Sequence, residues 1–275
     1  ELTELLDVKD FENDYLDQNK NIDQVTHIFH QGACSDTMEW DAEYMMKNNY
    51  SFSQKLLELA EKNSVSFIYA SSASVYGDGK QFSEARENEN PINLYAFSKY
   101  LFDQLIRQKI NESKIQIVGL RYFNVYGPNE AHKGHMASVA YHLHKQLEKG
   151  DEVKLFEGSD GYEAGEQRRD FVYVDDVVKV NLWFKENPEI SGIFNVGTGK
   201  SQTFNEVANS VINFHKKGSI QYIPFPKELV GSYQSFTEAD LGKLRAAGYP
   251  DDFLDVQTGV QLYLEKLSNW PKNES

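Results

Sequence analysis

Three short apolar segments, separated by stretches long enough for a helix, constrain the fold of this chain more than any other feature. The segments are residues 25–30, 65–70 and 115–120, each short for a buried helix but long enough for a strand. Residues 36–62, between the first two, carry apolar side chains at roughly helical spacing. Strand, helix, strand, helix, strand at these intervals predicts an α/β fold with a doubly wound parallel sheet.

Small and hydroxylated residues follow the first two predicted strands. Residues 31–35 come directly after the first strand, and residues 71–77, with three serines, come after the second. In open α/β sheets the ligand crevice lies just beyond the carboxyl ends of the strands, where a small-residue loop lets a ligand approach the backbone. These loops therefore predict a ligand-binding edge, although an ordinary strand-to-helix turn at 31–35 stays open as an alternative.

A tyrosine and a lysine four residues apart suggest proton-transfer chemistry at that edge. Tyr95 and Lys99 lie in a predicted helix, so both side chains can face one reacting atom. A cation beside a phenol favours the phenolate and lowers its pKa. Ser72, at the end of the second strand, would hold a substrate hydroxyl by hydrogen bonding. The alternative is that Tyr95 and Lys99 are surface residues of an amphipathic helix, because this spacing is common by chance.

Composition excludes several classes of function. The formal charge of −14 over 275 residues lacks the basic surface that nucleic-acid phosphates require. No apolar run approaches the ~20 residues that cross a bilayer, so we expect no membrane association and a cytoplasmic location. The single cysteine, Cys34, excludes an internal disulfide framework. The histidines near residue 135 lack a spaced carboxylate or fourth ligand, so we predict no metal site.

Several signals divide the rest of the chain. Residues 1–20 are predicted to form an acidic helix, and Gly127-Pro128 breaks regular structure where a second lobe is expected to begin. Thr203 or Asn205 is a candidate helix cap. The predicted division is a Rossmann-like domain over 1–126, to which 170–198 return, and a smaller C-terminal α/β substrate lobe over 127–169 and 199–275.

Taken together, these motifs resemble the extended short-chain dehydrogenase/reductase family over nearly the whole chain. The resemblance is carried by Ser71–Gly77, by Tyr95 and Lys99, and by residues 121–128, 169–176 and 194–199. Within that family, residues 30–35, 39–41, 44–46, 132–138 and 156–159 resemble the nucleotide-sugar epimerases that act on C6 of an ADP-linked heptose. The resemblance implies bound NADP, an ADP-heptose substrate oxidised to a transient ketone and reduced from the opposite face, and a role in lipopolysaccharide core assembly.

The resemblance also implies roles for individual residues. The proton-transfer groups would be Tyr95 and Lys133, supported by Lys99 and Ser72. The implied cofactor contacts are Gln31, Gly32, Ala33, Cys34, Ser35, Asn48, Lys99, Val125 and Lys133. The implied substrate contacts are Asn124, His135, His142, Phe156, Glu157, Gly158, Ser159, Arg169 and Tyr233. His135 departs from the family, which usually has a smaller residue there. The family commonly forms rings of five subunits, so we expect a homo-oligomer.

The chain also departs from the family pattern at its beginning. The family opens with a strand, a glycine-rich turn and a helix that receives the pyrophosphate, and this sequence has none of them. We therefore expect an N-terminally incomplete copy of the natural protein, without the strand end that selects NAD or NADP. A hexose 4-epimerase remains an alternative, as does a cofactor-less binding protein of the same fold. A dehydratase would need an acidic pair where this chain has Ala73-Ser74.

Overall fold

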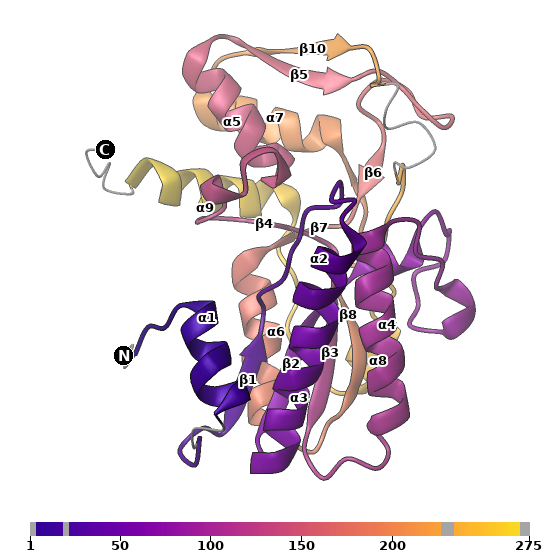
Figure 1. Cartoon of the computed structure of the whole chain (residues 1–275). Helices are drawn as coiled ribbons and strands as arrows, with labels where there is room; N and C mark the ends of the chain where they lie inside the picture. Colours follow the sequence, from indigo (N-terminus) through magenta and orange to yellow (C-terminus); the bar gives the residue numbers. More distant parts are fainter. Residues whose placement is uncertain (1–3, 19–21, 227–233, 270–275) are drawn as a thin grey trace.

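The computed structural model describes residues 4–18, 22–226 and 234–269 (Figure 1). Four strands form the central sheet of this part of the chain, and all neighbouring pairs are parallel. In sheet order they are β1 (His27–His30), β2 (Ser66–Ser72), β3 (Ile117–Tyr122) and β8 (Gly192–Val196). The three predicted strands are confirmed, each within two residues of its expected start.

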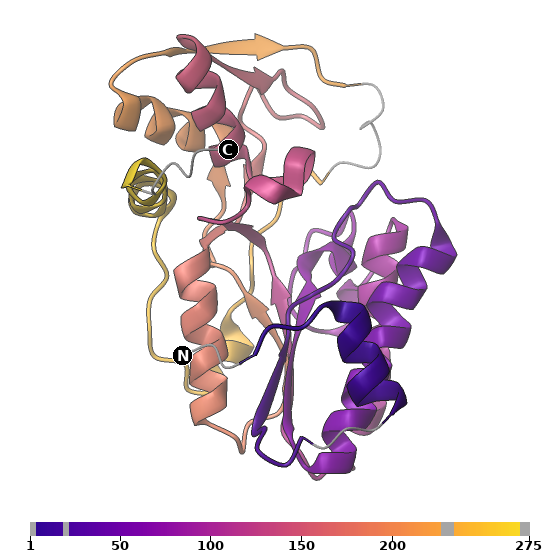
Figure 2. The same cartoon turned by 60° about the vertical axis from the view of Figure 1, so that its left-hand side comes forward.

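Helices cover both faces of this sheet, as Figure 2 shows with the sheet seen nearly edge-on. The strands have apolar side chains on both faces because both faces are buried. Phe67 packs towards α3 (Phe52–Asn63) and α4 (Leu94–Lys109), whereas its neighbour Ile68 packs towards α6 (Val174–Glu186) on the other face. The doubly wound α/β arrangement predicted from the spacing is therefore confirmed.

Capping residues set the helix starts. The helix expected from residue 36 begins instead at α2 (Ala42–Met46), because the Asp41 carboxylate accepts the Tyr44 N–H at 2.9 Å. It continues through a wider turn, η2 (Lys47–Ser51), into α3. α4 begins after Asn93, whose side chain accepts the Ala96 N–H at 2.8 Å.

The acidic N-terminal helix is shorter than predicted. α1 (Val8–Phe11) begins after its cap, Asp7, and the helical path continues through η1 (Glu12–Asp17). Phe11 and Tyr15 pack against the core cluster that includes Leu57 on α3. Residues 1–3 and 19–21 lie outside the described part.

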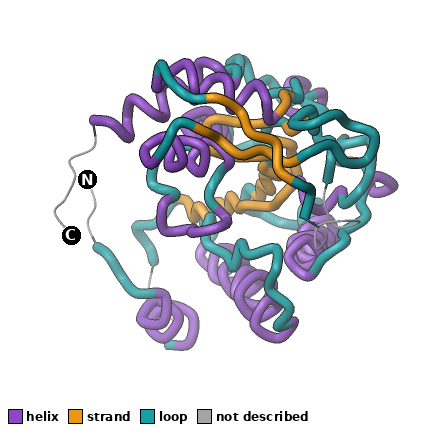
Figure 3. The backbone as a smooth tube through the Cα atoms, turned by 90° about the horizontal axis from the view of Figure 1, so that it is seen from above, coloured by secondary structure: helices purple, strands orange, loops and turns teal. Residues whose placement is uncertain are grey.

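A second lobe sits beyond the carboxyl ends of the sheet strands, and Figure 3 views the molecule from this end. Its core is formed by apolar side chains of three helices and three strands. The elements are β4 (Asn124–Tyr126), η5 (Ala131–Met136), α5 (Val139–Lys149), β5 (Glu152–Phe156), β6 (Arg168–Arg169), β7 (Phe171–Tyr173), β9 (Gln202–Thr203), α7 (Phe204–His215), β10 (Ser219–Ile223) and α9 (Val256–Asn269). Thr203 caps α7 in a capping box with Glu206, so one of the two predicted caps is confirmed.

One stretch assigned to the lobe from sequence packs on the sheet instead. α8 (Gly242–Ala246) carries Leu244, which joins the core cluster of Val118 and Phe194. The Lys243 ammonium donates to the carbonyl of Ile193 at 2.8 Å. The predicted boundary at residue 199 therefore assigns α8 to the lobe, although α8 packs against β8 of the sheet. None of the helices in the described ranges is long and apolar enough to cross a membrane.

Candidate active site

A cavity of about 960 Å³ lies at the carboxyl ends of β1, β2 and β3, facing the second lobe. Its position is the one expected for a ligand crevice in a parallel sheet. The lining residues that the sequence had singled out are Gln31, Gly32, Ala33, Cys34, Ser35, Ser72, Tyr95, Lys99, Asn124, Val125 and Lys133. Residues separated by about a hundred positions in the sequence thus meet at one cavity.

The sheet side of this cavity carries Tyr95, Lys99 and Ser72. Tyr95 and Lys99 lie one turn apart on α4, and the Lys99 ammonium donates to the carbonyl of Ala70 on β2 at 2.9 Å. The Lys99 nitrogen is 6.0 Å from the centre of the Tyr95 ring. The Ser72 hydroxyl accepts the Ser74 N–H at 3.1 Å and forms a hydrogen bond with the Tyr95 side chain. A phenol, an ammonium and a hydroxyl are thus held around one point.

Burial shapes the proton affinities of this group. Burial lowers the pKa of the Lys99 ammonium to about 8, and the negative charge of Asp103 opposes that shift. Burial also raises the pKa of the Tyr95 phenol, while the hydrogen bond with Ser72 acts in the other direction. The expectation that Lys99 lowers the pKa of Tyr95 is therefore wrong for this structure, because desolvation of the phenolate dominates.

The loop at residues 31–35 is braced by Asn49, a residue that the sequence analysis missed. The Asn49 side chain accepts the Cys34 N–H at 2.8 Å and donates to the Cys34 carbonyl at 2.9 Å. It also donates to the Ser98 hydroxyl on α4 at 3.0 Å. Asn48, the predicted contact, does not line the cavity, and its amide donates to the Tyr44 carbonyl at 2.7 Å. Helical register could have distinguished them, because position 49 lies one turn after buried Met45.

A second brace at the cavity, also missed, links β3 to α6. Tyr122 donates to the Gln31 side chain at 2.8 Å and accepts from the Asn181 amide at 2.9 Å. The Gln31 amide donates in turn to Asn181 at 3.2 Å, closing a triangle. Burial raises the pKa of Tyr122 to about 12, so its hydroxyl remains a donor at neutral pH. The triangle fixes the start of the 31–35 loop over the sheet.

The lobe side of the cavity carries Lys133. It lies in η5, where Gly134 breaks the helical path with φ 55° and ψ −123°. Lys133 is exposed. The segment is anchored at its ends by buried Glu130, which accepts the Ser138 N–H at 2.7 Å, the Ser138 hydroxyl at 2.6 Å and the Tyr263 hydroxyl at 2.8 Å. Glu130 was also missed from sequence.

Most predicted substrate contacts lie in the lobe and do not line this cavity. Arg169 is 6% exposed, and its guanidinium lies 5.9 Å from the ring centre of Phe204, which does line the cavity. The His135 side chain is exposed, and the His142 ring contacts the His135 carbonyl at 3.3 Å.

The loop at residues 156–159 is held by Gln167, whose amide donates to the Glu157 carbonyl at 3.0 Å and to the Ser159 hydroxyl at 3.2 Å. This loop comprises the predicted contacts Phe156, Glu157, Gly158 and Ser159. Asn124 is the one predicted substrate contact in the described ranges that lines the cavity. Tyr233 lies outside the described residues.

The cavity has hydrogen-bond donors that suit the hydroxyls of a nicotinamide cofactor. An ammonium has three N–H donors, and one of those on Lys99 bonds to Ala70, leaving donors for a ligand hydroxyl. The exposed 31–35 loop provides backbone at the strand ends, with no side chain on Gly32. The chemistry of these residues therefore fits the cofactor. Within the described ranges, no group of three or more metal-ligating side chains forms a metal site.

Comparisons with known proteins agree with this geometry. The model of the NAD dependent epimerase/dehydratase family matches residues 4–197. A curated protein of Alkalilimnicola ehrlichii, ADP-L-glycero-D-manno-heptose-6-epimerase, is 51% identical over 93% of this chain and 80% of its own length.

Solved structures agree as well. The Helicobacter pylori ADP-L-glycero-D-manno-heptose-6-epimerase is 34% identical with a TM-score of 0.77, covering 90% of this chain and 74% of that one. The Thermus thermophilus UDP-glucose 4-epimerase in complex with NAD is 26% identical with a TM-score of 0.74, covering 90% and 79%. These findings confirm the resemblance seen in the motifs, and the chain belongs to the NAD-dependent epimerase/dehydratase family.

Proposed function

We propose that this protein is an NADP-dependent epimerase that inverts C6 of the heptose in ADP-D-glycero-D-manno-heptose, giving ADP-L-glycero-D-manno-heptose. The relatives that carry the heptose 6-epimerase name support the substrate. The choice of NADP over NAD follows the resemblance of the motifs. The reaction would serve lipopolysaccharide core assembly in the cytoplasm.

One observation carries the proposal: Tyr95 and Lys133 line the same cavity. Tyr95 comes from α4 beside the sheet, and Lys133 comes from η5 in the lobe. Inversion at a carbon needs a proton-transfer group on each side of that carbon, or one that moves between them. A heptose C6 lying between the two side chains would have both.

The chain's own residues then have separable roles. A nicotinamide cofactor, when bound, supplies hydride acceptance and hydride return. Ser72 hydrogen-bonds the C6 hydroxyl, and one of Tyr95 and Lys133 removes its proton. After the ketone has presented its other face, the second of the two gives a proton to its oxygen. Lys99 binds the cofactor and keeps a positive charge near Tyr95.

The remaining predicted contacts would bind the nucleotide part of the substrate. Arg169, with the 156–159 loop, lies in the lobe, and a guanidinium suits bidentate contact with a phosphate. Phe204 lies beside the Arg169 guanidinium and also lines the cavity, so a substrate could extend from Tyr95 across the lobe to Arg169. His135, His142 and Tyr233 belong to the same proposed substrate set.

The test is to incubate the full-length protein with ADP-D-glycero-D-manno-heptose and to follow the C6 epimer by NMR. We expect the epimer to form, and to form faster when NADP rather than NAD is supplied. A parallel sample with UDP-glucose separates the rival activity. Conversion of UDP-glucose to its C4 epimer, without heptose turnover, would make the protein a hexose 4-epimerase. Absence of nicotinamide absorbance and of both reactions would make it a binding protein.

The oligomeric state is a further part of this proposal. We expect five subunits in a ring, following the family resemblance. Size-exclusion chromatography with light scattering on the full-length protein would measure the number directly. A monomer or dimer at micromolar concentration would contradict this expectation without affecting the proposed reaction.

A further inference from the structure

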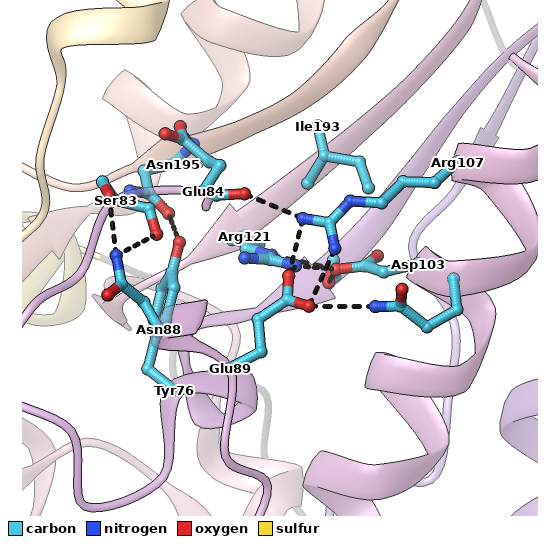
Figure 4. Close-up of polar contacts among 12 residues, drawn as sticks. Tyr76, Ser83, Glu84, Asn88, Glu89, Asp103, Arg107, Arg121, Ile193 and Asn195 are labelled. Atoms are coloured by element: carbon cyan, nitrogen blue, oxygen red, sulfur yellow. Dashed lines mark hydrogen bonds and ion pairs between the residues drawn. The ribbon is translucent and has the colours of Figure 1, made fainter. Parts of the chain in front are cut away.

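A buried cluster of charged side chains joins α4, β3 and the loop before α4 (Figure 4). Asp103 on α4 and Arg121 on β3 have no measurable exposure, and both are ion-paired at 2.8 Å. Glu89, in the loop before α4, pairs with Arg121 and, at 2.6 Å, with Arg107. Burying charged groups is costly unless each is paired and hydrogen-bonded. Because desolvation offsets most of the attraction between buried charges, pairing alone gives this cluster little net stability.

Asp103 differs from Glu89 because it also holds the strand that forms the cavity wall. Its carboxylate accepts the Tyr69 hydroxyl at 2.7 Å and the Ser71 hydroxyl at 2.9 Å. Burial, followed by the charge of Asp103, holds the pKa of Tyr69 well above its usual range, so that hydroxyl is a donor. Two residues of β2 are thus tied to one side chain of α4.

These two hydrogen bonds are made by neighbours of the β2 residues Ala70 and Ser72, which line the cavity. Ala70, between Tyr69 and Ser71, offers the carbonyl that accepts the Lys99 ammonium, and Ser72 follows directly. Lys99 lies one helical turn before Asp103 on the same helix. The helix that carries the ammonium and the strand that carries its acceptor are therefore joined by the carboxylate one turn away.

We infer that Asp103 is a positioning residue: through Tyr69 and Ser71 it holds α4 against β2 and so places Lys99, and its carboxylate also acts directly on the Lys99 ammonium. The inference rests on the proposed function only for its effect on turnover. Its effect on Lys99 itself requires no substrate. Glu89 shares Arg121 with Asp103, but among the described residues its side chain bonds to Gln104, Arg107 and Arg121 rather than to β2, which makes it the matched control.

The groups facing Lys99 determine in which direction its pKa should move when Asp103 loses its charge. Asp103 stabilises the charged ammonium, while burial acts against it. His30 at the end of β1 faces Lys99 as well, but burial lowers the pKa of His30 to about 3, with a contribution from Lys99. His30 is therefore neutral near pH 8. Tyr95 is also protonated there, because burial raises its pKa, and Arg121 carries its charge throughout. Removing the Asp103 charge should lower the pKa of Lys99.

The experiment compares Asp103→Asn with Glu89→Gln in the full-length protein, after circular dichroism has shown that both are folded. With ¹³Cε-labelled lysine, NMR follows the titration of Lys99 without substrate. We expect its midpoint to fall by on the order of one pH unit in Asp103→Asn and to stay unchanged in Glu89→Gln. An equal midpoint in both variants and the wild type would overturn the inference.

Turnover provides a second reading. We expect kcat of Asp103→Asn to fall about 10- to 100-fold, with the alkaline limb of its pH profile moved to lower pH and KM nearly unchanged. Tyr69→Phe removes one tether while keeping every charge, and should lower kcat several-fold. Wild-type kcat in Tyr69→Phe would also overturn the inference. If the wild-type protein does not turn over the heptose, the proposed function fails while the NMR titration still tests Asp103.

Discussion

The two sides of the cavity hold the proposed proton-transfer groups under opposite physical conditions. On the sheet side, Lys99 is 5% exposed and bonded to β2, and burial sets the proton affinity of both Lys99 and Tyr95. On the lobe side, Lys133 is exposed on a short segment whose ends are tied through Glu130. The contrast indicates that the Tyr95–Lys99 side is preorganised, whereas the Lys133 side can adapt. Such a combination suits a ketone that must turn between two hydride transfers.

The largest expected effect separates the two sides by chemical rescue. Tyr95→Phe and Lys133→Ala should each lower kcat by about 10²- to 10⁴-fold, the usual contribution of a positioned acid or base. Added ethylamine should restore part of the activity of Lys133→Ala, because that side is open. Added phenol should restore none in Tyr95→Phe. Epimer formation by NMR measures both, and failure of the amine to rescue would remove the contrast.

A second prediction concerns the anchor of the lobe side. Glu130→Gln should cost up to about 3 kcal/mol of unfolding free energy, because it disturbs a buried carboxylate with three donors. It should also lower kcat, because it loosens the segment that carries Lys133. Urea denaturation measures the stability change, with exposed Glu163→Gln in the same lobe as control. Equal stability of the two variants would show that the segment needs no such anchor.

A third prediction uses the cost of burying Lys99. Its pKa of about 8 in the folded state, against a usual 10.5, costs about 3 kcal/mol at pH 7. Lys99→Met should therefore raise the unfolding free energy by on the order of 2 kcal/mol after the hydrogen bond to Ala70 is lost.

The sign of this effect depends on pH. Between about pH 8 and 10.5 the unfolded chain binds more protons at Lys99 than the folded chain does. The unfolding free energy of the wild type therefore rises with pH in this range, and its difference from that of Lys99→Met becomes smaller. Lys133→Met, on the exposed side, should change stability by less than about 0.5 kcal/mol at any pH. A destabilised Lys99→Met variant at pH 7 would refute this account of the sheet side.

The smallest expected effect tests the brace of the 31–35 loop. Asn49→Ala removes the side-chain partner of the Cys34 backbone and should weaken binding of the nicotinamide cofactor about fivefold, corresponding to ~1 kcal/mol. Asn48→Ala should leave the affinity within about twofold of wild type, since its amide bonds to its own helix. Isothermal titration calorimetry measures both, and the reverse order would restore Asn48 as the cofactor contact.

Local patterns predicted the sheet well because strand and helix periodicities are local. The apolar runs at 25–30, 65–70 and 115–120 became the parallel strands β1, β2 and β3. The helix-capping roles of short polar side chains were predicted less completely. Thr203 was one of two candidate caps for α7, but Asp41 was not predicted to cap α2, and the helix start was placed six residues early. Both caps act within three residues, so the signal was present in the sequence.

Long-range contacts could not be read from such patterns. The return of α8 to the sheet depends on Leu244 meeting Val118, far apart in the sequence. Asn49 and Glu130 acquire their roles only when a loop or a distant helix supplies their partners. The pKa direction at Tyr95 was predicted from one neighbouring charge, whereas burial by the whole fold decided it.

The sequence alone determined the alternation of strands and helices from β1 to β3, and the placing of Tyr95 and Lys99 on one helix face, since both follow from local residue spacing. Only the tertiary structure decided that Lys133 faces the same cavity, that Asp103 ties α4 to β2, and how burial moves the pKa values there. The reason is that desolvation and charge–charge interaction depend on distance in space, which spacing along a chain does not specify.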